Sequence, residues 1–410
     1  MLQTIRNAWK IEEIRKKILF TLFIILLYRI GNSIPVPYVN VAYLEQYFKT
    51  LENTVLGLYN VMSGGAFSSA TIFALSIQPY INASIIIQLL CIAIPALERM
   101  AKEEGEEGKK KINNITRYST VGIGLLQGFA YYMLIKNNGL LSETGFWPGL
   151  VIVVTFTAGS ALVMWMGEQI TEFGVGNGIS MILFAGIVSR FPTGVIAMIS
   201  NIMSGAVAWW IVVLMLIGAL ALVVLVVLVN QAERRIPVQY SKRVVGRKMY
   251  GGQSTHLPMK VNMSGVLPVI FAQSIASLPA TIAAFVGKSD GWFLKLFDTT
   301  GWFYALIYFL LIIFFSYFYS TIQFNPVEVA NNLKKNGGFI PGYRPGKPTS
   351  EFIMKVLNKI TLFGAISPAA ANSGISLGGT SIIIVVGVAL ETVQTLENQM
   401  LMRHYKGFLE

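Results

Sequence analysis

The run from Ile211 to Val229 contains no charged side chain. As an α-helix, a run of this length crosses roughly 30 Å of hydrocarbon. One such run would also suit a buried helix of a large soluble protein, but similar runs recur along the chain. Only 13% of the 410 residues are charged, about half the share in soluble domains. The sequence therefore predicts an all-α polytopic membrane protein.

Ten apolar segments have a composition suited to spans. We expect transmembrane helices near Ile18–Ile34, Ile72–Ala96, Tyr118–Ile135, Leu150–Met166, Ile179–Ser189, Ala206–Val229, Met263–Val286, Trp302–Thr321, Phe352–Ala371 and Ser381–Thr395. The first segment lacks a small-residue cleavage site after it, so we expect it to be retained as a span.

The distribution of positive charge supports this division. If the ten spans alternate and the N-terminus is cytoplasmic, 26 of the 32 Lys and Arg residues lie inside and 5 outside. Arg29, late in the first span, is the remaining one. An excess of cytoplasmic Lys and Arg is the usual bias of membrane proteins. We therefore expect both termini to be cytoplasmic.

Two cytoplasmic loops are longer and more basic than simple connectors. The loop 230–262 contains short β-prone pieces around Gly251 and Gly252, which suggest a projecting hairpin. The loop 323–350 contains a stretch rich in Pro and Gly that is unsuited to a helix. Such loops can simply fix topology and attract anionic lipid. Their length favours docking of a partner.

The chain shows no motif for catalysis. It contains no GxxxxGK[ST] sequence, only two histidines (His256 and His404) and one cysteine (Cys91). Neither a metal site nor a cofactor is indicated. The glycine-rich 174–178 follows an apolar helix rather than a strand, so we expect a tight turn between helices there. The chain is not expected to be an enzyme.

The predicted spans contain amides and small residues in place of ionisable groups. Gln88, Gln127 and Gln273 each suit a hydrogen bond between helices, and together they would soften a helix boundary enough for it to open. A secondary transporter of a small solute is the alternative function. It would usually keep ionisable groups at mid-membrane, and the span interiors hold almost none.

A short segment rich in small residues, 62–69, lies between the first two spans. It is too short and too polar to cross the bilayer. Non-spanning structure at membrane depth is tolerated where protein encloses it. A plugging segment and a plain external loop both remain open on this pattern.

Several longer motifs occur in a fixed order along nearly the whole chain. They are IPVP (34–37), SGGA (63–66), PYI (79–81) with ASIIIQLL (83–90), GNGIS (176–180), STHLP (254–258) with KVNMSGVLP (260–268), NPVEVANNLKKNGGFIPGYRPG (325–346) and GGTS (378–381). With these motifs the chain resembles the SecY family of protein-conducting channels.

This resemblance implies two inverted-repeat halves, 1–200 and 201–410, around an hourglass pore. It implies a channel that moves unfolded secretory polypeptides across the bacterial plasma membrane and releases transmembrane segments laterally into it. The apolar ring of the pore would comprise Ile81, Ile85, Ile179, Leu183, Ile270 and Ile384. The plug would be 59–73, centred on Met62, Ser63, Gly64, Gly65, Ala66 and Phe67.

The resemblance also implies partners. The two basic loops would dock the motor ATPase SecA and the ribosome through Lys242, Arg243, Arg247, Lys248 and Arg344. Further partners would be the small subunits SecE and SecG, signal peptides, nascent chains and membrane lipids. Spans two and three, facing seven and eight, would form the lateral gate. Two residues depart from the family pattern: Tyr38 stands where glycine is usual, and Gln78 stands where an apolar residue or serine is usual.

Overall fold

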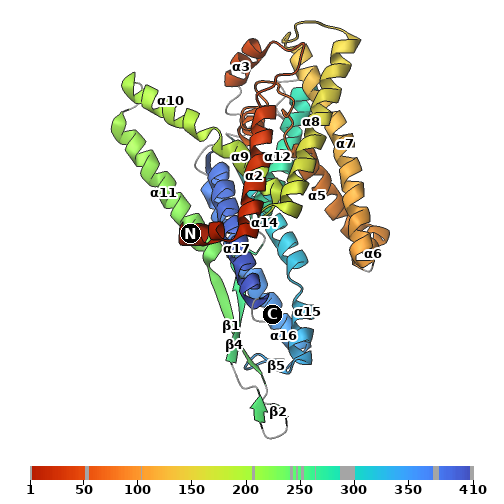
Figure 1. Ribbon diagram of the computed structural model, residues 1–410, viewed down its shortest axis with the longest axis vertical. Helices are drawn as coiled ribbons and strands as arrows, with labels where there is room; N and C mark the ends of the chain where they lie inside the picture. The colour runs from red at the N-terminus through yellow and green to blue at the C-terminus, as the bar shows by residue number, and fades with distance from the viewer. Residues whose placement is uncertain are drawn as a thin grey trace. The chain divides into compact units, whose positions relative to one another are not determined.

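In a computed structural model of the chain, the structure describes residues 2–50, 55–102, 104–205, 208–240, 243–245, 248–250, 254–263, 265–286, 301–372 and 378–406 (Figure 1). Most of these residues are helical. The helices of the N-terminal part are α1 (Leu2–Lys10), α2 (Glu12–Gly31), α3 (Val41–Thr50), α4 (Val55–Met62), α5 (Gln78–Ala93), α6 (Pro95–Lys102), α7 (Gly105–Asn137), α8 (Phe146–Phe173), α9 (Gly178–Val188), α10 (Phe191–Met203) and α11 (Trp209–Gln231).

The C-terminal part contains fewer helices and all the strands. Its helices are α12 (Leu267–Val286), α14 (Trp302–Gln323), α15 (Pro326–Lys335), α16 (Lys347–Asn372) and α17 (Gly378–Lys406). The strands are β1 (Glu233–Tyr240), β2 (Arg243–Val245), β3 (Lys248–Tyr250), β4 (Ser254–Lys260) and β5 (Gly338–Phe339).

Each of the ten expected spans falls on a helix. Within the described chain, five helices are long and apolar enough to cross a membrane, and a sixth span results if the bent pair α5 and α6 is counted as one. The other expected spans lie on α2, α7, α12 and α16. Three of these helices include charged residues, and the apolar part of α12, Leu267–Ala276, is short.

Two expected spans have different bounds in the structure. The second span does not begin at Ile72, because residues 72–77 form turns and α5 starts at Gln78, with Pro79 in its first turn. Proline suits that position, since its missing N–H has no helical partner there. The fifth span, expected to end at Ser189, matches α9, which ends at Val188 with Ser189 as its C-cap, and α10 then extends the apolar helical segment to Met203.

The described chain divides into two compact units. The first comprises Met1–Met215, Ser274–Tyr304 and Ser376–Glu410, and the second comprises Leu216–Gln273 and Ala305–Ile375. In the first unit, α7 and α8 lie side by side (Figure 1).

Small residues allow α7 and α8 to approach closely. A Cβ added at Gly124 would lie 3.4 Å from Thr157 Cγ2, and one at Gly128 would lie 3.3 Å from the Val153 carbonyl oxygen. Helices in lipid gain little from the hydrophobic effect between them, so close backbone packing of this kind stabilises the pair.

The glycine-rich 174–178 is the tight turn between α8 and α9 that the sequence predicts. Gly176 has a φ of +75°, which glycine adopts without steric cost. Asn177 caps α9, because its side-chain oxygen accepts hydrogen bonds from the amides of Ile179 and Ser180. Thr21 of α2 accepts from the Val175 amide at 3.1 Å, which ties the turn to the first span.

The second unit contains a three-stranded antiparallel sheet of order β4-β1-β5. Strand β1 pairs with β4 along its length, from Glu233 opposite Lys260 to Gln239 opposite Ser254. The hairpin expected in 230–262 is therefore present. Ile236 and Val238 of β1 point to one side and are buried with side chains of α15 and α16. The loop 323–350, in which a Pro/Gly-rich stretch was expected to be non-helical, also contains the helix α15 ahead of that stretch.

Candidate functional site

The predicted plug, 59–73, begins in α4 and continues as hydrogen-bonded turns. Gly64 and Gly65 have φ angles of +70° and +94°, a region that favours glycine. The Asn60 carbonyl accepts from the Gly65 amide at 2.9 Å, and its side-chain oxygen accepts from the Ser68 amide at 3.0 Å. The segment is therefore folded. Among the six central residues the burial is as follows: Met62, Ser63, Ala66 and Phe67 are buried, and Gly64 and Gly65 are half-buried.

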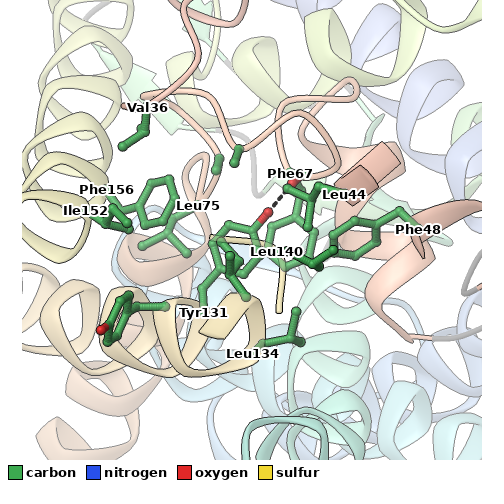
Figure 2. Close-up of a cluster of buried hydrophobic side chains, with 14 of the residues drawn as sticks. Val36, Leu44, Phe48, Phe67, Leu75, Tyr131, Leu134, Leu140, Ile152 and Phe156 are labelled. Carbon is green, nitrogen blue, oxygen red and sulfur yellow. Dashed lines mark hydrogen bonds between the residues drawn. The ribbon is translucent and has the colours of Figure 1, made fainter. Parts of the chain in front are cut away.

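Phe67 anchors this segment in the first unit (Figure 2). Its ring stacks on Tyr131 of α7 with 4.3 Å between centroids and meets Phe48 of α3 edge to face at 5.1 Å. Tyr131 also donates its hydroxyl hydrogen to the Phe67 carbonyl oxygen. Aromatic pairs of this kind add about 0.5–1.5 kcal/mol beyond the area they bury. The C-terminal side of the plug is thus firmly held.

The tip of the plug, Met62 to Gly64, lies against α9 and α2. A Cβ added at Gly186 of α9 would overlap the carbonyl oxygen of Met62. A Cβ at Gly64 would lie 2.7 Å from Ser189 Oγ and 3.2 Å from Arg29 Nη1. The tip therefore touches both helices, and only glycine fits at the two facing positions.

Polar side chains contact the same tip. Asn32 donates from Nδ2 to the Ser63 carbonyl at 3.3 Å, and Gln78 donates from Nε2 to Met62 Sδ at 3.3 Å. Two other polar atoms of these side chains, and one of the nearby Arg29, are buried without a protein hydrogen-bond partner among the described residues. They are Arg29 Nη1, Asn32 Oδ1 and Gln78 Oε1. A buried unpaired polar group costs about 1–3 kcal/mol.

The six predicted ring residues lie on four helices. Ile81 and Ile85 share one face of α5 and are 3% and 4% exposed. The others are Ile179 (half-buried) and Leu183 (buried) on α9, Ile270 (buried) on α12, and Ile384 (buried) on α17. Ile270 belongs to the second unit and the other five belong to the first.

The three predicted gate amides lie on three helices. Gln88 of α5 donates to Ser84 Oγ of the same helix at 3.2 Å. Gln127 of α7 is half-buried, and Gln273 of α12 is 4% exposed. The Gln88–Ser84 bond lies within one helix, a local role that the sequence pattern does not distinguish from a bond between helices.

Of the predicted docking residues in the first loop, Lys242 and Arg247 lie outside the described residues. Arg243 begins β2 and Lys248 begins β3, and these two short strands pair with each other. The hairpin β1–β4 therefore extends into a second, smaller hairpin near its end.

Arg344 lies in a well-defined turn of the second loop. Its side chain is exposed, and its carbonyl accepts a hydrogen bond from Thr349 Oγ1 at 2.8 Å. Gly342 and Gly346 flank it with positive φ angles of 87° and 106°. The neighbouring Tyr343 stacks on Phe352 of α16, with 4.2 Å between ring centroids. The turn thus presents an exposed guanidinium on a rigid base, since Tyr343 is fixed by that stacking.

Ion pairs connect the basic ends of the first-unit helices. Arg117 of α7 pairs with Glu168 of α8 at 2.8 Å, and that hydrogen bond raises the pKa of the guanidinium. Lys111 pairs with Glu104, also at 2.8 Å, and the pKa of Lys111 is raised for the same reason. Both cations therefore stay charged throughout the physiological pH range.

Sequence reasoning did not identify several residues that contact the plug. They are Arg29, Asn32, Phe48, Tyr131, Gly186 and Ser189. Arg29 had a detectable signal, because an arginine within an apolar span is unusual and marks a functional position. The other five have no such signal, since asparagine, aromatic residues, glycine and serine are all common in and beside helices.

Comparison with known proteins shows which family this chain is similar to. The family model for SecY matches residues 71–393. The protein translocase subunit SecY of Streptomyces scabiei is 45% identical over 440 residues, covering all of both chains. That of Corynebacterium glutamicum is 44% identical over 446 residues, again over both full lengths.

Solved structures agree at the level of the fold. A structure of a protein-conducting channel matches with a TM-score of 0.68 over 94% of this chain and 92% of the other, at 16% identity. A structure of Sec61 in the canine ribosome–channel complex from the endoplasmic reticulum matches with a TM-score of 0.64, over 94% and 92% of the chains, at 15% identity. At these identities the likeness concerns the fold alone.

Proposed function

The chain belongs to the SecY family of protein translocase subunits, and on this premise we propose how its residues serve a protein-conducting channel. It is a multi-pass membrane protein and a channel subunit of a translocase, and not an enzyme. Identity to curated translocase subunits along the full length is the observation that supports this function most.

We propose that the channel moves unfolded secretory polypeptides across a bacterial plasma membrane and lets transmembrane segments leave sideways into lipid. The halves 1–200 and 201–410 would surround the pore, with both termini in the cytoplasm. The strong cytoplasmic excess of Lys and Arg supports this orientation.

Six aliphatic side chains would form the ring at the narrowest part of the pore. Branched aliphatic groups exclude water and ions by dewetting, yet they adapt to passing chains of different sequence. The burial of Ile81, Ile85, Leu183, Ile270 and Ile384 is compatible with such a closed ring. The folded segment 59–73 would seal the channel from outside.

Gln88, Gln127 and Gln273 would weaken the helix boundary at the lateral gate. In the closed gate such an amide would form hydrogen bonds across helices, and in the open gate it would form them with water or a signal peptide. The free-energy cost of opening the gate would therefore be small. Gln88 already donates to Ser84 Oγ within α5, a bond that does not depend on a second helix.

The two basic loops would dock SecA and the ribosome, and SecE and SecG would complete the membrane complex. The rigid turn around Arg344 and the long hairpin β1–β4 support docking, because a preformed surface loses little entropy on binding. The chain has no nucleotide-binding motif of its own, so the driving energy would come from the partner.

Crosslinking of a stalled secretory polypeptide tests the channel directly. Photoreactive residues at Ile81 and Ile270 in membrane vesicles should both crosslink to the stalled chain, since the ring surrounds the translocating polypeptide. The same residue at Ile86 of α5, which is 46% exposed, should not. Crosslinks at Ile86 alone would exclude a pore lined by the ring.

Arg344 offers a test of motor docking. Arg344→Glu reverses an exposed charge on a rigid turn and should slow SecA-driven translocation at least tenfold, while chain insertion and the fold remain intact. The matched control is Lys136→Glu, the same charge reversal at an exposed residue predicted to lie outside. Equal translocation rates for the two variants would contradict the docking role.

A further inference from the structure

Three polar side chains surround the tip of the plug, and we call Arg29, Asn32 and Gln78 the plug clasp. Each approaches one of three consecutive residues. Asn32 Nδ2 bonds to the Ser63 carbonyl, Gln78 Nε2 bonds to Met62 Sδ, and Arg29 Nη1 lies 3.2 Å from the Cβ position of Gly64.

The hydrogen bonding between the plug clasp and the tip of the plug is incomplete. Among the described residues, Arg29 Nη1, Asn32 Oδ1 and Gln78 Oε1 are buried with no protein partner. The one bond that Gln78 makes goes to a thioether sulfur, a weak acceptor. The cost of leaving an amide oxygen unpaired exceeds the small net gain of such a bond. The seated plug is therefore held less firmly than an apolar seat of the same shape would hold it.

The positive charge of Arg29 also weakens the hold on the seated plug. In the described chain its guanidinium forms no ion pair, and the other groups nearest the Cβ position of Gly64, the Ser189 hydroxyl and the Gly186 carbonyl, are uncharged. The C-terminal end of α2 provides partial negative charge, because Arg29 lies in its last turn. Arg29 is half-buried with its Nη1 atom enclosed, and this partial charge offsets the cost of enclosing that atom only in part.

We infer that the plug clasp sets how readily the plug leaves its seat. When the tip moves away, the three atoms gain partners from water or from peptide groups in the open channel, so their cost is relieved only on opening. This inference rests on the proposed channel function, and it adds that Gln78, which departs from the family pattern, lowers the threshold for opening.

Resting ion conductance of the reconstituted translocase in planar bilayers tests the inference. Gln78→Met keeps the length of the side chain and removes the unpaired oxygen, so resting conductance should fall about tenfold. If instead the Gln78–Met62 bond holds the plug in place, conductance should rise. A rise, or a value within twofold of wild type, overturns the inference.

Gln399→Met provides the matched control. Gln399 of α17 also has a buried side-chain oxygen without a protein partner in the part of the chain that the structure describes. It forms no described contact with the plug, so its substitution should leave the resting conductance unchanged. An equal fall in both variants would assign the effect to general stabilisation and overturn the inference.

Arg29→Met tests the clasp from a second helix. Removal of a positive charge alone would raise cation conductance, so a fall can come only from a more firmly seated plug. Translocation of a secretory polypeptide by the wild-type protein is measured in parallel. If wild type fails to translocate, the proposed function is wrong. If it translocates while Gln78→Met or Arg29→Met fails to lower conductance, only the inference is wrong.

Discussion

At the scale of the residue, Tyr38 departs from the family pattern and adopts a backbone conformation that favours glycine. The family usually has glycine after IPVP, and Tyr38 has a φ of +69°. The left-handed region costs an L-residue roughly 1–2 kcal/mol and costs glycine little. Turn contacts hold the residue there, since its carbonyl accepts from the Ser142 amide at 2.9 Å.

This strain predicts the relative stability of two variants. Tyr38→Gly and Tyr38→Ala both remove the half-buried ring, but only glycine relieves the backbone. The glycine variant should therefore be more stable than the alanine variant by about 1 kcal/mol, although glycine normally disfavours folding. Thermal unfolding in detergent measures this difference. A more stable alanine variant would show that the turn relaxes when the ring is lost.

At the scale of the element, the close packing of the proposed plug against α9 depends on Gly186, which has no side chain. A Cβ at Gly186 would overlap the Met62 carbonyl, which is backbone and does not move aside by a rotamer change. Helix packing around such a position is close because no side chain intervenes.

Gly186→Ala should therefore displace the tip of the plug and raise resting conductance severalfold. The control is Gly122→Ala on α7, where an added Cβ would meet no atom within 4 Å. That variant should conduct as wild type does, and alanine should even favour its helix slightly. Conductance that is unchanged in both variants would show that the tip is not part of the seal.

Most elements were predictable from apolar runs, because a helix in lipid must be long, apolar and internally hydrogen-bonded. The start of the second span and the continuation of the fifth into α10 were not. Residues 72–77 are mostly apolar, yet they form turns that pack in the same apolar cluster as Phe67. Apolar character alone does not distinguish such turns from a helix. The division into halves 1–200 and 201–410 stays a prediction.

At the scale of the whole molecule, the proposed ring takes residues from both compact units. Ile270 belongs to the second unit and Ile81 to the first. Because the proposal takes one side chain from each unit, its test removes both in a double substitution.

Ile81→Gly with Ile270→Gly should raise the ion leak of the resting channel by at least tenfold, because the dewetting constriction is widened. The control replaces Ile86 of α5 with glycine. Its side chain is 46% exposed, and the change imposes the same helix penalty of about 1 kcal/mol. A bilayer recording that stays tight for the double variant would refute the ring.

The sequence by itself determined the membrane class, the ten helical segments, the turn at 174–178 and the hairpin in 230–262. Each follows from a local pattern: uncharged length, glycine spacing or β-prone pieces around glycines. The resemblance of ordered motifs added the family, which full-length identity confirmed.

Only the tertiary structure decided what surrounds the plug. Arg29 with Asn32, Gln78 and Gly186 come from three separate parts of the sequence, and their residue types suit many roles in or beside a helix. Their meeting at Met62 to Gly64 results from the packing of α2, α5 and α9 around one loop. The cost of an unpaired atom depends on burial and neighbours, which no local pattern specifies.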